Sequence, residues 1–314
     1  MREKRNFAER TKALRSDEVR KKYFLVYEGK DTELLYFDAV NELRREIKIN
    51  PLIELVPIVR SYSEDGWSNP KKIVDRMSQN IQESQTGVIS YETMLNWIME
   101  YFQDEGYIAN NRTFAKTVWR TLQWICEEKL KVSLNDNIHD LNCACQKLFE
   151  CLNKETEFSN LVIDIAKIVN YGKITYEENF DKICFIVDRD KESFTAEQYD
   201  YVILQCEEKH YGFFLTNPCF EFWLLLHFTD VGDLDSDKLL ENPLVTAKYR
   251  YAESELRKRI PGFKKSKYDA LSLVRNINTA ITNEEYFCEE IIGLKTNVGS
   301  NIGILIKEMQ VGNG

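Results

Sequence analysis

Four short apolar runs, each about as long as a β-strand, constrain the fold of this chain more than any other feature. They lie at residues 23–27, 53–59, 182–187 and 211–215 and are rich in β-branched or aromatic side chains. Helical patterns follow the first and the third run. Strands that alternate with helices form parallel sheets through right-handed crossovers, with helices on both faces. We therefore expect an α/β fold in which helices flank a parallel sheet.

The stretch from about residue 81 to residue 175 interrupts this alternation. It has almost no Gly or Pro and carries several helical patterns. A segment of this length is too long to be one crossover between two strands. We predict that residues 81–175 form an all-helical insertion subdomain with Trp97, Trp119 and Trp124 packed mainly within it. Residues 1–80 and 176–314 then form the α/β domain, with a basic N-terminal segment and a helical C-terminal part.

Composition predicts a soluble protein of the cytoplasm. No stretch approaches the roughly 20 apolar residues that cross a membrane, and no apolar segment follows the basic start as it would in a secretory signal. The eight cysteines are scattered and several lie in apolar runs, which is typical of reduced core thiols. His139, Cys143, Cys145 and Cys151 match no usual zinc spacing, so we expect them to belong to an amphipathic helix.

The charge of the chain is unevenly distributed. The net charge is −9, yet residues 1–22 hold nine Lys and Arg against four Asp and Glu, and residues 248–275 hold nine against three. Two basic segments on an acidic chain suit a phosphate backbone, and they equally suit two solvated helix faces. Charge alone does not decide between a nucleic-acid partner and an ordinary surface.

The first candidate site residues follow the first predicted strand, in the sequence EGKDTELLYF. Glu28 stands at the strand end, where ligands gather in open parallel sheets. Gly29 permits a tight turn, and Asp31 or Thr32 is placed to cap the next helix. Glu33 lies in the first helical turn, where an acid interacts favourably with the helix dipole, so a structural role is its default interpretation.

Two aspartates follow the third predicted strand, in KICFIVDRD. Residues two apart on a strand project to the same side, so Asp188 and Asp190 are expected to point together. Nearby carboxylates repel one another unless a proton or a hard cation offsets their charge, and oxygen ligands suit Mg²⁺ or Mn²⁺. Together with Glu28, the pair predicts a metal site at one edge of the sheet. Ordinary strand-end and turn residues are the alternative for the pair taken alone.

A third candidate lies in TNPCFEFWLLLHF. Asn217 and Pro218 are typical of a helix start, and the helix that follows is almost entirely apolar. Glu221 is costly to bury there without a cation, so it either faces the site or reaches a Lys or Arg. His227 is expected to interact with the C-terminal end of this helix dipole. The chain has no GxxxxGK[ST] motif, so nothing predicts NTP hydrolysis.

These three ordered motifs resemble the RloB-like family, which belongs to the TOPRIM superfamily and is associated with bacterial restriction and abortive-infection loci. The resemblance covers about residues 1–86 and 176–280, and implies a TOPRIM-like (Rossmann-like) sheet. Within it, Glu28 matches the TOPRIM glutamate, and Asp188 and Asp190 match its DxD pair. Glu33 and Glu221 match acidic positions of the RloB-like pattern. The helical stretch from 81 to 175 departs from the shorter members of the family.

The resemblance implies a nuclease of the TOPRIM type in anti-phage defence, with Mg²⁺ or Mn²⁺ held by Glu28, Asp188 and Asp190. The segment GFKKSKYDA loosely matches a downstream family segment, and it supplies three candidate phosphate contacts: Lys264, Lys265 and Lys267. DNA or RNA is then the expected substrate, and a separate ATPase an expected partner. One alternative is a non-catalytic sensor or effector subunit. Another is a different phosphoryl-handling enzyme with a DxD motif, such as a glycosyltransferase.

Overall fold

The computed structural model describes residues 20–29, 31–58, 69–86, 88–104, 106–108, 112–155 and 176–310. The chain divides into two compact units. The sheet unit contains Val19–Arg60, Gly66–Asp75 and Glu177–Gly314, and the helical unit contains Arg76–Tyr176. Of the basic segment at residues 1–22, residues 1–19 lie outside the described part of the chain.

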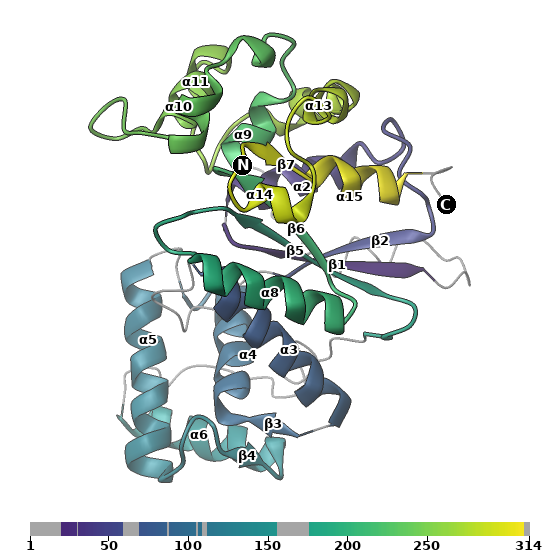
Figure 1. Cartoon of the computed structure of the whole chain (residues 1–314). Helices are drawn as coiled ribbons and strands as arrows, with labels where there is room; N and C mark the ends of the chain where they lie inside the picture. Colours follow the sequence, from purple (N-terminus) through teal and green to yellow (C-terminus); the bar gives the residue numbers. More distant parts are fainter. Residues whose placement is uncertain are drawn as a thin grey trace. The chain divides into compact units, whose positions relative to one another are not determined.

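The sheet unit is built on a five-stranded, mostly parallel sheet with the order β2-β1-β5-β6-β7 (Figure 1). The strands are β1 (Lys21–Tyr27), β2 (Ile53–Ile58), β5 (Lys182–Asp188), β6 (Gly212–Asn217) and β7 (Gly299–Ser300). The first four pair in parallel and coincide with the four predicted strands, so the α/β expectation is confirmed. No strand was predicted at β7, which pairs antiparallel with β6. A strand of two residues leaves no alternation in the sequence to detect.

Helices cover both faces of this sheet. On one face, α2 (Thr32–Glu42) and the helices after β6 bury the alternate strand residues Leu25, Cys184 and Ile186. On the other face, α8 (Ala196–Glu208) packs Tyr199 against Phe213, with their ring centroids 6.1 Å apart. Both α2 and α8 are the crossover helices expected between parallel strands.

The chain after β6 is mostly helical, as predicted. Its helices are α9 (Phe220–Leu225), α10 (Ser236–Glu241), α11 (Tyr251–Arg259), α12 (Ala270–Arg275), α13 (Ile277–Glu284), α14 (Ile291–Leu294) and α15 (Ile302–Met309), with a 3₁₀ turn at Val231–Asp233. Because α9 is apolar on all sides, every one of its residues is buried, including Glu221.

The helical unit contains α4 (Tyr91–Asp104), α5 (Arg112–Trp124), the π-helical segment η2 (Ile125–Leu130) and α6 (Leu141–Glu155), and α3 (Pro70–Thr86) supplies residues to both units. The prediction that the insertion is all-helical is wrong in one detail. Two short strands, β3 (Ile89–Ser90) and β4 (Asn137–Ile138), form an antiparallel pair. They pair because the chain after η2 returns to the start of α4, where Tyr91 N donates to Asp136 O.

The helical unit has its own apolar core. Trp119 is buried in it and the half-buried Trp97 packs against it, as predicted. Trp124 does not fit the prediction, because its side chain is exposed and the Lys129 ammonium lies 5.0 Å from its ring centroid. Cys143 is also exposed rather than part of a core. No helix in the described parts of the chain is long and apolar enough to cross a membrane.

Candidate functional site

Glu28 and Asp188 meet at the carboxyl ends of the neighbouring parallel strands β1 and β5. Glu28 follows β1 directly, and its backbone N donates to Ile186 O at 3.0 Å. Asp188 is the last residue of β5. Its backbone N donates to Glu28 Oε2 at 2.8 Å, which fixes the carboxylate of Glu28 against the end of β5. The two residues therefore occupy one sheet edge, as the strand pattern predicted.

Glu33 turns back from the first turn of α2 toward this edge. Its side chain is buried, and Oε1 accepts a hydrogen bond from Gly29 N at 3.1 Å. A Cβ atom at position 29 would collide with the carboxylate of Glu33, so a larger residue there would force this side chain out of its present position. Asp31 occupies the N-cap position but makes no side-chain cap. Burial raises the pKa of Glu33, and the negative charge of Glu221 raises it further.

Asp188 is the least compensated acid of the site. Its Oδ1 atom is buried and has no hydrogen-bond partner among the described residues. Burial raises the pKa of this carboxyl well above its usual range, and the neighbouring charges of Glu33, Glu28 and Glu221 add to the rise. We call Glu28, Glu33, Asp188 and Glu221 the carboxylate cluster, and the raised pKa values of Glu33 and Asp188 come from burial and, in part, from repulsion among these acids.

Lys265 supplies the positive charge of this cluster. Its Nζ lies 2.6 Å from Glu221 Oε1, and the Glu221 side chain is only 3% exposed. Both roles left open for Glu221 are thus realised, since it lies in the site and also reaches a lysine. Burial lowers the pKa of Lys265, but the charge and hydrogen bond of Glu221 outweigh burial, so the pKa is raised. The lysine stays protonated.

A tight turn presents the three predicted lysines differently. Lys264 N donates to Lys267 O at 3.1 Å, and Lys267 N donates to Lys264 O at 2.8 Å. Phe263, fully buried, anchors the start of the turn. All three lysine side chains are exposed, and this geometry brings the Lys265 ammonium to Glu221 of the cluster.

The predicted convergence of Asp190 with Asp188 is wrong. Asp190 is exposed, and its carboxylate accepts hydrogen bonds from Glu192 N and Ser193 Oγ, both at 3.0 Å. The strand ends at Asp188, so the alternation that places residues two apart on one side does not continue. Asp190 instead closes a turn, which is a common use of aspartate.

Of two smaller expectations about the segment after β6, the one for Asn217 is wrong and the one for His227 holds in position but not in charge. Asn217 is not a helix cap, because β6 extends to it and pairs it with Gly299 of β7, while Cys219 precedes the first turn of α9. His227 does lie at the C-terminal end of α9 as expected, with its Nδ1 3.1 Å from Trp223 O and 3.2 Å from Leu224 O. Burial lowers its pKa to about 4, so the ring meets this helix end as a neutral group, and its Nε2 lies 2.9 Å from the hydroxyl of Tyr36.

Sequence patterns did not indicate two residues that shape the site. Arg189 is buried, and its Nη1 donates to Phe194 O at 2.6 Å, which holds the loop after β5. Tyr268 donates from its hydroxyl to Thr32 O at 2.7 Å and so ties the lysine turn to the start of α2. The only signals were position: Arg189 lies between the two aspartates, and Tyr268 lies three residues after Lys265.

The donor chemistry of the cluster suits a hard cation, although no complete ligand set is preformed. Within the described part of the chain, no group of three or more His, Cys, Asp or Glu side chains is arranged to hold a metal ion. Two predicted ligands, Glu28 and Asp188, do lie together, and Asp188 Oδ1 lacks a partner there. All four acids offer oxygen atoms, which Mg²⁺ and Mn²⁺ prefer. The residues therefore fit such an ion, with Asp190 turned away.

Comparison with known proteins gives one match. The family model described as RloB-like protein matches residues 23–309, which is nearly the whole chain. No curated protein and no solved structure matches.

Proposed function

The chain belongs to the RloB-like protein family, and from this premise we propose that it is a metal-dependent nuclease of the TOPRIM type that acts in bacterial anti-phage defence. The observation that carries the proposal is the buried, unpartnered Asp188 Oδ1 among three further carboxylates. Such an excess of buried negative charge is unfavourable by itself, and a divalent cation offsets it. The cluster also lies where open parallel sheets bind ligands.

In this proposal Glu28 and Asp188 hold Mg²⁺ or Mn²⁺, and Glu33 and Glu221 contribute negative charge around them. A bound ion of this kind supplies Lewis-acid polarisation of a phosphodiester and a more acidic water. Asp190 joins the ligand set only if its turn opens, so it is the weakest of the three predicted ligands.

The chain's own residues supply orientation and charge. The hydrogen bond from Asp188 N fixes the Glu28 carboxylate at the cluster, where it is placed to bind a metal or to act as general acid or base. Lys265 is charged and lies at the cluster, so it is placed to contact a phosphate oxygen of the substrate. Lys264 and Lys267 hold the flanking phosphates without reading bases.

A second candidate is a non-catalytic subunit of a defence complex. Two observations favour it: no three-ligand group exists among the described residues, and Lys265 already neutralises Glu221. In that case the cluster is structural. A separate ATPase is a proposed partner under either function, because the chain has no phosphate-binding loop motif.

The test is cleavage of labelled DNA and RNA by purified full-length protein with Mn²⁺ or Mg²⁺. Asp188→Asn should lower the cleavage rate at least about 100-fold, because it removes a charged ligand at the reacting centre. Asp237→Asn is the matched control, since it makes the same change at an exposed position in the first turn of α10. Equal rates for Asp188→Asn and wild type would contradict the nuclease proposal. Wild-type protein that neither cuts nor binds nucleic acid would support the subunit instead.

A further inference from the structure

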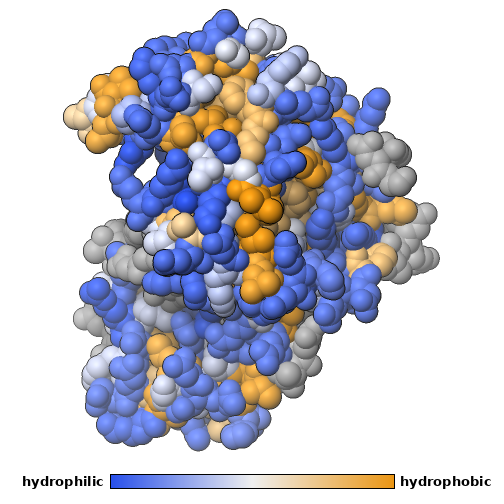
Figure 2. Space-filling view, viewed as in Figure 1, coloured by the Kyte–Doolittle hydropathy of each residue, from blue (hydrophilic) through white to orange (hydrophobic). Residues whose placement is uncertain are grey.

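The loop between α10 and α11, residues 243–250, projects from the sheet unit with a defined backbone. Leu244 and Arg250 form an antiparallel bridge, and Val245 N donates to Tyr249 O at 3.0 Å. Thr246 Oγ1 closes the turn by accepting from Tyr249 N at 3.0 Å. Figure 2 shows apolar atoms gathered where Figure 1 draws this loop, at the upper left. We call it the α10–α11 loop.

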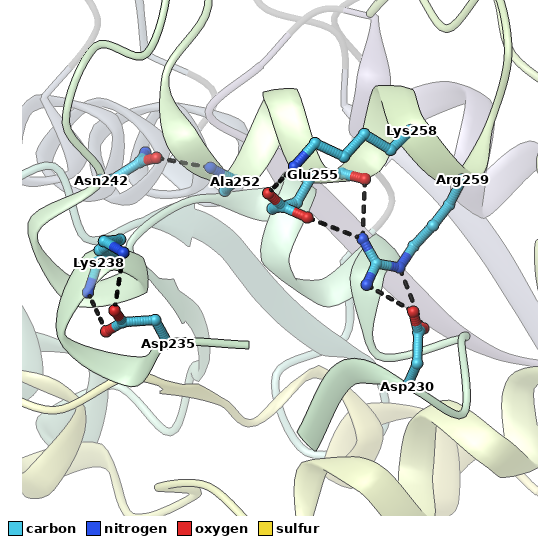
Figure 3. Close-up of polar contacts among 8 residues, drawn as sticks. All are labelled: Asp230, Asp235, Lys238, Asn242, Ala252, Glu255, Lys258 and Arg259. Atoms are coloured by element: carbon cyan, nitrogen blue, oxygen red, sulfur yellow. Dashed lines mark hydrogen bonds and ion pairs between the residues drawn. The ribbon is translucent and has the colours of Figure 1, made fainter. Parts of the chain in front are cut away.

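The base of the loop is fixed beside the carboxylate cluster. Asn242 adopts a left-handed conformation with φ 41°, and its Oδ1 accepts from Ala252 N at 2.9 Å (Figure 3). Its Nδ2 lies 3.6 Å from the sulfur of Cys219, two residues before Glu221. Arg250 Nη2 lies 3.6 Å from the carboxylate of Glu192, in the loop that follows β5. The α10–α11 loop therefore starts from the same edge of the sheet as the cluster.

Two adjacent apolar side chains of the loop, Leu244 and Val245, contribute little burial to the sheet unit. Leu244 is 64% exposed and Val245 is 52% exposed, so neither contributes much apolar burial. Fixing a backbone costs about 1–2 kcal/mol per residue, and here no core packing compensates that cost. Adjacent exposed apolar side chains on a defined loop are typical of a contact surface.

The charges around the loop favour a polyanion. Most basic residues of the segment at 248–275 are already paired, as with Arg259, which binds Asp230 and Glu255. Lys248 is exposed in this loop, and it has no ion pair among the described residues, nor do Lys264 and Lys267. Opposite Val245 in the loop, the Tyr249 ring has its centroid 3.8 Å from the Arg257 guanidinium, which keeps the ring in place. Two exposed apolar side chains in the same loop as the Lys248 ammonium are complementary to an unpaired base next to a phosphate.

We propose that the α10–α11 loop binds unpaired bases of the nucleic-acid substrate, with Leu244 and Val245 against the bases and Lys248 against a phosphate. The inference rests on the proposed function and adds a substrate class to it: nucleic acid with a single-stranded region next to the cleaved bond. Because the base of the loop adjoins the cluster, the unpaired bases would lie close to the phosphate that reacts.

The test is binding of three fluorescent probes without divalent cations, so that no cleavage occurs. The probes are a DNA duplex, the same duplex with a central mismatched bubble, and one of its single strands. Wild-type protein should prefer the bubble and the single strand to the duplex. The double variant Leu244→Ser/Val245→Ser should bind those two probes about tenfold more weakly and the duplex within twofold of wild type. Ile292→Ser is the matched control, because Ile292 is 78% exposed elsewhere in the same unit.

Each outcome bears on one proposal at a time. A double variant that binds all three probes like wild type, or a wild type without preference for unpaired bases, overturns the inference and leaves the nuclease proposal to the cleavage assay. Loop-dependent binding with no cleavage in Mn²⁺ supports the inference and overturns the nuclease proposal. Equal losses for the control and the double variant would also overturn the role of the loop.

Discussion

In two acid-rich regions of the sheet unit, the pKa values of the carboxyl groups are shifted in opposite directions. In the ion-pair network around α11, Arg259 Nη2 lies 2.7 Å from Asp230, and its Nη1 lies 3.1 Å from Glu255 (Figure 3). The hydrogen bond from Arg259 lowers the pKa of Asp230. Burial raises the pKa of Glu255, but hydrogen bonds from Lys258 and Arg259 outweigh it, so that pKa is also lowered. In the carboxylate cluster the pKa values of Glu33 and Asp188 are raised.

The difference comes from the balance of charge rather than from the residue types. The network pairs two acids with two bases, whereas in the cluster the ion pair of Lys265 is with one acid, Glu221. A balanced network is complete without a ligand, and its role is to hold α11 in place. An unbalanced cluster gains most from an added cation, which is why we place the function there and not in the network.

The largest expected effect concerns Glu284, a buried acid in neither region. Burial raises its pKa from 4.5 to about 8, although Gly303 N donates to it. Because the folded state holds this proton more tightly than the unfolded chain, its contribution to stability is greatest below pH 4.5 and is lost as the pH rises to about 8. The free energy of unfolding should fall by on the order of 4 kcal/mol across this range.

Urea unfolding of wild type and Glu284→Gln at several pH values measures this loss, and the variant should show a flatter pH dependence. Glu285→Gln is the control, since Glu285 is half-exposed and paired with Lys307. The same slope for Glu284→Gln and wild type would mean that burial alone does not retain the proton, and the comparison of the two regions would lose its physical basis.

The next largest effect, on the free energy of unfolding, is expected when the central base of the network, Arg259, is replaced. Arg259→Met leaves the nearly buried Glu255 with one exposed partner, so unfolding should become easier by about 3 kcal/mol. Lys258→Met removes the other base, whose side chain is 65% exposed, and should cost less than about 1 kcal/mol. Thermal and urea unfolding of both variants test the contrast. Equal costs would show that the network is not organised around Arg259.

A smaller effect is expected from the same change in the cluster. Lys265→Met leaves Glu221 buried without its cation and should destabilise the fold by about 2 kcal/mol. The double variant Lys265→Met/Glu221→Gln should recover most of this loss, because the buried charge is then gone. A double variant as unstable as Lys265→Met would indicate that the lysine acts through packing and not through Glu221.

The smallest effect, and the one of opposite sign, is that of Asp188→Asn. Removing one charge from the cluster relieves repulsion, so the free energy of unfolding at pH 8 without divalent cations should rise by about 1 kcal/mol. Asp230→Asn makes the same change in the network and should lower stability by roughly as much. Urea unfolding of both variants measures whether the free energy of unfolding rises or falls in each. A destabilised Asp188→Asn would place the aspartate among structural residues.

Sequence patterns predicted the strands that bury both faces, because an apolar run of strand length has few other uses. Glu28 and Asp188 could be predicted as site residues because each comes directly after one of these apolar runs. The pattern failed at Asp190, where the strand had already ended. It also left the partner of Glu221 open, since Lys265 reaches it through a turn held by backbone hydrogen bonds. Contacts between loops that are distant in sequence depend on the assembled fold, so the local periodicity of the sequence does not predict them.

The bond between Asp188 N and Glu28 joins residues 160 positions apart, and Lys265 comes later still. During synthesis at roughly 5–20 residues per second, on the order of ten seconds separate the appearance of the first acid from that of the second. A nascent or prematurely terminated chain that lacks β5 contains Glu28 and Glu33 but no carboxylate cluster. A chain must be made past the lysine turn before the four acids and Lys265 come together, so a fragment released by a stalled ribosome would lack the cluster on which the proposed activity depends.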